Sequence, residues 1–175
     1  AAVDFHGGRG YTEKDWGQAF PRAWIWMQTN HFERQGISLI ASVARIPWLG
    51  SAFRGFIVGL LCDGELYRFA SYTGATIDHL HVTADKVVWE VSGPVMHAGQ
   101  RRRARLCLVA HRDEEAVDLL HAPARTAMLQ RVLESLTATV DVSLHIDGAG
   151  RESALFTGRG RHAGLELGGK VEDIL

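Results

Sequence analysis

Apolar and polar residues alternate with period two along most of this chain, which is the pattern of strands buried on one side only. In the run 138–146, "ATVDVSLHI", apolar side chains occupy the even positions and mainly polar ones the odd positions. The run 86–91, "KVVWEV", repeats the pattern, with Val87, Trp89 and Val91 on one face. Such runs predict antiparallel strands with one face on a core.

Short turn signals separate these runs. Asp63-Gly64 and Ala84-Asp85 each stand between two apolar runs, and Asp147-Gly148 follows a third. At this hairpin spacing the chain holds roughly nine to eleven strands, which predicts an all-β sandwich or a closed up-and-down barrel. Because predicted strands do not alternate with long helices, the pattern disfavours βαβ folds.

One stretch departs from period two. In residues 126–138, "TAMLQRVLESLTA", the apolar side chains also follow a helical stripe. A short helix on the outside of the barrel and a further strand therefore remain open for this stretch, and we expect at most one short helix in the chain.

The richest cluster of aromatic and amide side chains lies at 24–32, "WIWMQTNHF". In a single strand, pleating would send one set of side chains to the same face. That set is Trp24, Trp26, Gln28, Asn30 and Phe32. Because buried amides need partners, the set indicates the wall of a ligand cavity, and we expect both tryptophans on the inner face of a barrel. Bonds from the two amides to neighbouring backbone are the structural alternative.

Composition narrows the function classes. The 175 residues are 46% hydrophobic and carry a formal net charge of −1, so the electrostatic footprint of a nucleic-acid or membrane-surface binder is missing and an apolar small-molecule ligand fits better. The longest apolar run, 56–62, is far shorter than the ~20 residues of a transmembrane helix. We expect a soluble, cytoplasmic protein whose two cysteines, Cys62 and Cys107, are buried thiols.

Three other clusters are interpreted as structural features and not as binding sites. His79 and His81 share a strand face, but zinc needs at least three protein ligands, so we expect no metal site. The basic run 100–105, "QRRRAR", is typical of a solvated rim. The glycine-rich stretches 148–152 and 158–164 lack the strand-to-helix context of phosphate loops and predict hairpin turns.

Three motifs resemble the tocopherol cyclase family. The first runs through residues 11–32 and contains Glu13-Lys14, Trp16-Gly17 and Phe20-Pro21 ahead of the aromatic cluster. The others are "DGELYRF" at 63–69 and "HAGLELGG" at 162–169. Asp15 stands where plant members usually carry Asn, and "KVEDIL" replaces their Trp-bearing tail.

The resemblance implies a lipocalin-like antiparallel barrel over residues 1–175. Family members are longer and look like paired barrels, so this chain resembles their C-terminal half. We therefore expect it to contact a missing N-terminal barrel or a second chain.

The resemblance also implies a chemistry. Family members close a chromanol ring by protonating the prenyl-chain double bond of a prenylated quinol, and they require no redox cofactor or metal. On that basis we expect the chain to close a ring on, or to hydrate, a prenylated quinol or another isoprenoid lipid. Glu13 and Lys14 are then the candidate catalytic residues, with Glu166 and Asp15 as other candidate acids. The candidate substrate-binding residues are Trp16, Trp24, Trp26, Gln28, Asn30 and Phe32. An ion-paired barrel rim is the structural alternative for Glu13-Lys14, and a non-catalytic carrier or sensor of an apolar ligand is the functional alternative.

Overall fold

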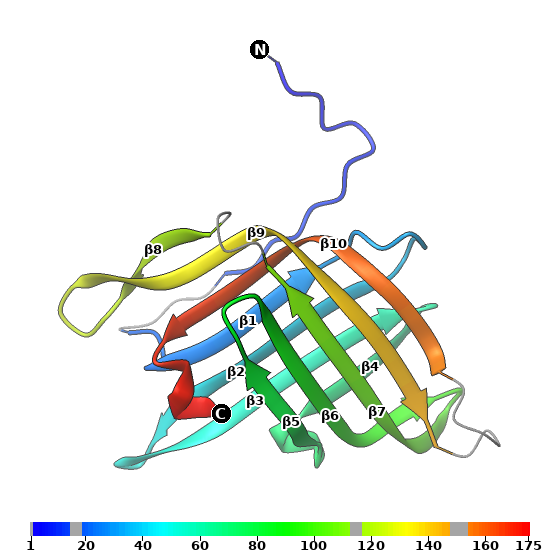
Figure 1. The fold of residues 1–175 in the computed structure, drawn as a ribbon. Helices are drawn as coiled ribbons and strands as arrows, with labels where there is room; N and C mark the ends of the chain where they lie inside the picture. Colours follow the sequence, from blue (N-terminus) through cyan, green and yellow to red (C-terminus); the bar gives the residue numbers. More distant parts are fainter. Residues whose placement is uncertain (1, 15–18, 113–116, 148–153) are drawn as a thin grey trace.

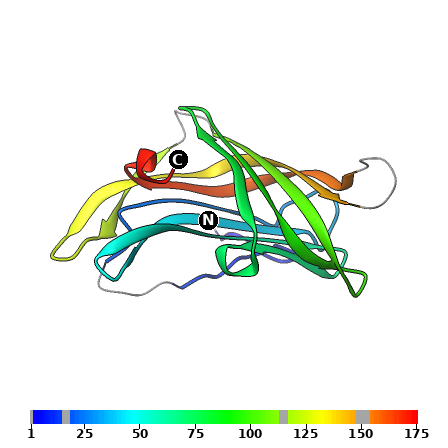
Figure 2. The same cartoon turned by 90° about the horizontal axis from the view of Figure 1, so that it is seen from below.

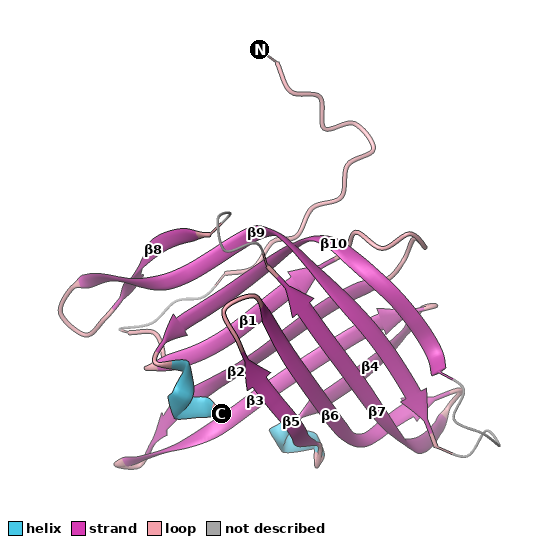
Figure 3. Cartoon of the chain, viewed as in Figure 1, coloured by secondary structure: helices cyan, strands magenta, loops and turns pink. Residues whose placement is uncertain are grey.

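The chain folds into one large antiparallel sheet, seen in a computed structural model that describes residues 2–14, 19–112, 117–147 and 154–175 (Figure 3). Its strands are β1 (Ala23–Thr29), β2 (Ser38–Trp48), β3 (Ser51–Cys62), β4 (Glu65–Ala70), β5 (Thr76–Val82), β6 (Lys86–His97), β7 (Gln100–His111), β8 (Asp118–Pro123), β9 (Met128–Ile146) and β10 (Ala154–Gly169). The helical elements in these residues are 3-10 turns at Ser71–Thr73 and Val171–Ile174. The predicted all-β, antiparallel fold is confirmed.

The order of strands in the sheet is β4-β3-β2-β1-β10-β9-β7-β6-β5, with β8 added to β9. The sheet curls over so that β1–β4 form one layer and β5–β7 cross in front of it, while the long strands β9 and β10 connect the two layers (Figures 1 and 2). The path of paired strands ends at β4 and β5, and β4 packs against β6.

The space between the layers is filled by apolar side chains. Its largest members include Trp89, Phe69 and Leu106, each with an exposed fraction below 2%. We call the face that lines this space the inner face. Because these side chains pack directly on one another, the interior serves as a hydrophobic core.

The turn residues behave as their sequence predicts. Asp63 and Gly64 join β3 to β4 with φ of 53° and 79°, the left-handed pair that a tight two-residue hairpin needs. Ala84 and Asp85 lie in the turn between β5 and β6. Asp147 follows β9 directly, whereas Gly148 lies outside the described residues.

The "DGELYRF" motif joins the two layers. Glu65 Oε2 accepts a hydrogen bond from the Tyr67 hydroxyl at 2.7 Å and lies 2.9 Å from His97 Nδ1, while its Oε1 accepts the Ala98 N–H. The Tyr67 hydroxyl is the main reason that the pKa of Glu65 is lowered, and burial raises the pKa of Tyr67. The contact joins β4 to the β6–β7 hairpin across the core.

The helix considered for residues 126–138 is wrong. Residues from Met128 onward form β9, which pairs with β10 and, in its first part, with β8. A register shift opposite Ala138 interrupts strict alternation, because pairing passes from Ala163↔Ala138 to Leu165↔Ser135. The apolar stripe itself does not mark a buried helix face, because Met128, Leu129, Leu133 and Leu136 are exposed and only Val132 of the stripe packs in a buried cluster.

Candidate functional site

The two tryptophans of β1 lie on the outer face of the sheet, opposite the core. The inner face of β1 carries Ile25 and Met27, both fully buried in the main core. Trp24 belongs to a separate buried cluster, with Trp26 packed against it. Our expectation of an inward-facing aromatic wall is therefore wrong, because the shorter aliphatic side chains fill the interior instead.

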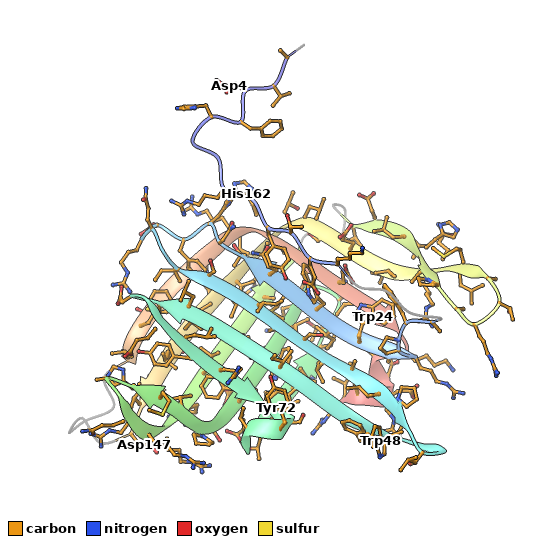
Figure 4. The ribbon with its side chains drawn as sticks, turned by 180° about the vertical axis from the view of Figure 1, so that it is seen from behind. Asp4, Trp24, Trp48, Tyr72, Asp147 and His162 are labelled. Atoms are coloured by element: carbon orange, nitrogen blue, oxygen red, sulfur yellow. The ribbon has the colours of Figure 1, made fainter. Side chains whose placement is uncertain are left out.

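Two other parts of the chain cover this outer face. Described residues before β1, among them Tyr11, Glu13 and Phe20, lie over it near Trp24 (Figure 4). The β8–β9 hairpin reaches it with Ala122 and Val132, which pack on Trp24. The Phe20 N–H donates to the Pro123 carbonyl at 3.1 Å, joining these two covers to each other. A surface that would otherwise face solvent is thus converted into a lined groove.

The groove has a volume of about 560 Å³. Its lining residues are Tyr11, Glu13, Ala19, Phe20, Pro21, Trp24, Trp26, Ser42, Ala44 and Glu166. They come from the N-terminal segment, β1, β2 and β10. The lining combines aromatic rings with small side chains and two carboxylates, as expected for an apolar ligand with a polar head.

Each tryptophan donates its indole N–H to a carboxylate. Trp24 Nε1 lies 2.9 Å from Glu166 Oε2, and Trp26 Nε1 lies 3.2 Å from Glu13 Oε2. The Tyr11 hydroxyl also donates to Glu13 Oε2. These bonds fix the orientation of the rings and hold both carboxylates at the groove wall.

Aromatic and cationic contacts complete the end of the groove near Trp24. Phe20 meets Trp24 edge to face, with centroids 5.6 Å apart. The Arg131 guanidinium lies 5.1 Å from the Trp24 ring centroid, and its Nη2 donates to the Pro21 carbonyl at 2.6 Å. Arg131 therefore ties β9 to the N-terminal segment across the indole.

Glycines on β10 make room for the indoles. Gly168 is the register partner of Trp24, and a Cβ added there would overlap the indole ring. A Cβ at Gly164 would approach Trp26 Cζ3 to 2.9 Å. The "HAGLELGG" motif thus supplies both a carboxylate, Glu166, and the space in which the tryptophans lie flat.

A row of carboxylates continues from the groove across the outer face. Glu166 of β10 pairs in register with Glu134 of β9, which in turn pairs with Asp118 of β8. The pKa of Glu134 is raised above its usual range. Burial is the main cause, followed by the negative charges of Glu166 and Asp118. Glu134 therefore keeps its proton to a higher pH than an exposed glutamate does.

The structure brings four of the predicted site residues together. Glu13, Trp24, Trp26 and Glu166 all line the groove. Lys14, next to Glu13, is exposed and is not a lining residue. Asp15 and Trp16 lie outside the described residues.

The remaining predicted residues lie elsewhere. Gln28 is 8% exposed and follows Trp26 on the outer face of β1. Asn30 donates from Nδ2 to the Gly10 carbonyl at 2.9 Å, the backbone partner that was the alternative to a cavity role. Phe32 belongs to the main core, where it meets Phe156 edge to face at 5.8 Å.

Sequence reasoning missed Phe20 and Arg131 as parts of the site, and Glu134 beside it. Phe20 was quoted only as part of a motif. Glu134 gave no signal, because residues 128–136 do not alternate and its neighbours Glu166 and Asp118 lie on other strands. Arg131 carried no signal, because its partners lie on segments more than a hundred residues away.

Two further findings concern metals and membranes. His79 and His81 are exposed with stacked rings 6.2 Å apart, and within the described ranges no group of three or more His, Cys, Asp or Glu side chains could hold a metal ion. The same part of the chain contains no helix long and apolar enough to cross a membrane.

Comparison with known proteins finds one family and two relatives for this chain. Residues 1–169 match the family described as tocopherol cyclase-like. A probable chloroplastic tocopherol cyclase of Oryza sativa subsp. japonica is 25% identical over 176 residues, which cover 95% of this chain and 35% of that protein. A chloroplastic tocopherol cyclase of Zea mays is 30% identical over 94 residues, or 51% of this chain and 19% of that protein.

No solved structure matches the chain significantly. The chain spans about a third of the length of the rice relative, and the family match includes all three motifs, of which those at 11–32 and 162–169 contribute residues to the groove. The match extends over nearly the whole chain, and on that ground the chain belongs to the tocopherol cyclase-like family.

Proposed function

We propose that this chain closes a ring on a prenylated quinol. A proton adds to the double bond of the prenyl chain, the phenol oxygen captures the resulting tertiary cation, and the phenol proton leaves to a carboxylate. The product is an isomer of the substrate, so the reaction consumes no oxidant or reductant. The names of the two relatives support the reaction class, and the geometry of the groove supports its location.

One observation carries the proposal: two carboxylates lie on the same aromatic wall, each held by an indole N–H. The tryptophan rings offer π faces to a developing cation, an interaction of about 2 kcal/mol when water is excluded. The carboxylates supply the groups that proton transfer requires. The small residues Ser42 and Ala44 leave room for an apolar chain.

The carboxylates differ in their surroundings. Glu13 accepts hydrogen bonds from Tyr11 and Trp26, whereas Glu166 accepts one from Trp24. Glu166, however, lies directly opposite Glu134, whose raised pKa favours a bound proton. We therefore assign proton delivery to Glu166, with Glu134 as the proton reservoir, and removal of the phenol proton to Glu13. Lys14, exposed beside Glu13, stays a predicted catalytic residue.

The test is to incubate the protein with phytyl-benzoquinol under reducing conditions and to separate the products by chromatography with mass detection. We expect a product of unchanged mass that lacks one phenolic hydroxyl. Glu166→Gln should abolish it and Glu13→Gln should slow it, whereas the exposed Glu33→Gln is the matched control and should leave it unchanged. Full activity in Glu166→Gln would refute the assignment of the acid.

A carrier of an apolar ligand is the second candidate, and the packed interior restricts it. Trp89 and Phe69 occupy the space where an interior ligand would lie, so a carrier would have to use the outer groove. Binding of the quinol without any product in the wild type would favour this function over ring closure.

The rest of the predicted setting is also proposed here. We propose that the chain is one barrel of a longer two-barrel protein, and that the outer face of β3 and β4, where Phe53, Ile57 and Leu66 are exposed, contacts the other barrel or a second chain. Light scattering would test this, since an isolated chain that stays monomeric at high concentration would count against it. The cytoplasmic location also stays a prediction, and the names of both relatives place those proteins in the chloroplast.

A further inference from the structure

The β2–β3 and β8–β9 hairpins project from the same end of the molecule (Figures 1 and 2). Both carry exposed apolar side chains at or near their turns. At the β2–β3 hairpin, Trp48 is 64% exposed and Leu49 is 90% exposed. Near the turn of the β8–β9 hairpin, Met128 is 58% exposed and Leu129 is 48% exposed. We call these four residues the apolar end.

The fold does not explain why a leucine occupies the β2–β3 turn. Its two central residues are Leu49 and Gly50, with φ of 45° and 81°. A turn of this kind favours Asn-Gly or Asp-Gly, because a left-handed backbone is unfavourable for residues with larger side chains. Leu49 therefore occupies a strained position and also leaves its side chain in solvent. A contact made outside this chain would explain both features.

Arginine side chains lie close to these apolar residues in the sequence and the fold. Arg45 of β2 is the register partner of Arg54, and it lines a surface hollow together with Arg22 and Asp173. Arg125 is exposed in the β8–β9 turn. Exposed Trp and Leu side chains beside guanidinium groups match a lipid interface, where Trp and Leu enter the acyl boundary and Arg meets the phosphates. Because a net charge of −1 supplies no general attraction to a membrane, the contact rests on these local groups.

We propose that the apolar end docks on the surface of a lipid membrane. Two separate narrow tips suit insertion between lipid headgroups better than the broad, continuous patch that a protein partner requires. The β8–β9 hairpin also covers Trp24 with Ala122 and Val132, so the docked end would hold the groove beside the lipid. Docking does not depend on ring closure.

Flotation with vesicles tests the proposal on the full chain. We expect the wild type to float with phosphatidylcholine vesicles and more strongly when phosphatidylglycerol is included. Leu49→Asn should weaken binding about tenfold, because an apolar side chain leaves the interface. The same change should raise the melting temperature, because Asn suits the turn, so that lost binding cannot reflect misfolding.

Matched variants separate the lipid contact from other causes. Leu155→Asn replaces a leucine that is 43% exposed at the start of β10, away from the hairpin tips, and should leave flotation unchanged. Arg125→Gln should weaken binding to anionic vesicles only. The proposal is overturned if the wild type does not float, or if Leu49→Asn floats equally well. It is also overturned if Leu49→Asn only converts a dimer into a monomer in light scattering, which would assign the apolar end to a second copy.

Discussion

The fold disfavours the ionised form of Glu134. It lies opposite Glu166 and Asp118, and burial together with these two groups raises its pKa. In the unfolded chain the pKa returns to about 4.3. A carboxyl whose pKa is raised by folding costs the folded state free energy once it ionises, so stability falls as pH rises from the unfolded pKa through the folded one.

The size of the effect follows from the register. Charges on directly opposed strand residues about 6 Å apart repel by about 0.7 kcal/mol at the dielectric of water and about 3 kcal/mol at an effective dielectric of 20. Because Glu134 is only half-buried, solvent screens its repulsion with Glu166, and the smaller of the two energies applies. We expect Glu134→Gln to raise the free energy of unfolding by about 1 kcal/mol near pH 8 and to leave it unchanged near pH 4.

The assay is urea unfolding followed by tryptophan fluorescence across this pH range. The exposed Glu33→Gln is the control and should show no comparable gain at any pH. A Glu134→Gln variant that is less stable than the wild type near pH 8 would show that Glu134 makes favourable contacts as an anion. A gain that does not vary with pH would show that packing, and not charge, is responsible. Either result would remove the basis for a proton held beside Glu166.

Three further predictions concern the groove and the core. Gly168→Ala places a methyl group against the Trp24 indole, so the free energy of unfolding should fall by about 1–3 kcal/mol in urea titration, and an unchanged value would contradict the close packing. Arg131→Met removes the cation over Trp24 and the hydrogen bonds to the segment before β1. Amide hydrogen exchange in that segment should accelerate while the core stays protected. Exchange rates equal to those of the wild type would mean that other contacts hold the segment. Cys62 is buried and Cys107 half-buried, and burial raises the pKa of both free thiols. A disulfide reagent should therefore label both more slowly in the native protein than in urea, with Cys62 the slower, and equal rates in the two conditions would refute this.

The sequence by itself determined the strands and most of their turns. Period-two patterning is a local property, so it survives in runs such as 86–91 whatever the rest of the chain does, and Asp63-Gly64 fixes a hairpin through its own backbone preferences. The motif residues Glu13, Trp24, Trp26 and Glu166 were also recognisable, and the structure gathers them in one groove.

The tertiary structure alone decided which face of β1 became the site. Alternation separates Ile25 and Met27 from Trp24 and Trp26 but does not say which pair faces the core. The curl of the sheet placed the aliphatic pair inside, and two segments about a hundred residues apart then covered the tryptophans on the outside. Strand register places Glu134 of β9 opposite Glu166 of β10. This pairing is long-range, so the local sequence pattern does not predict it.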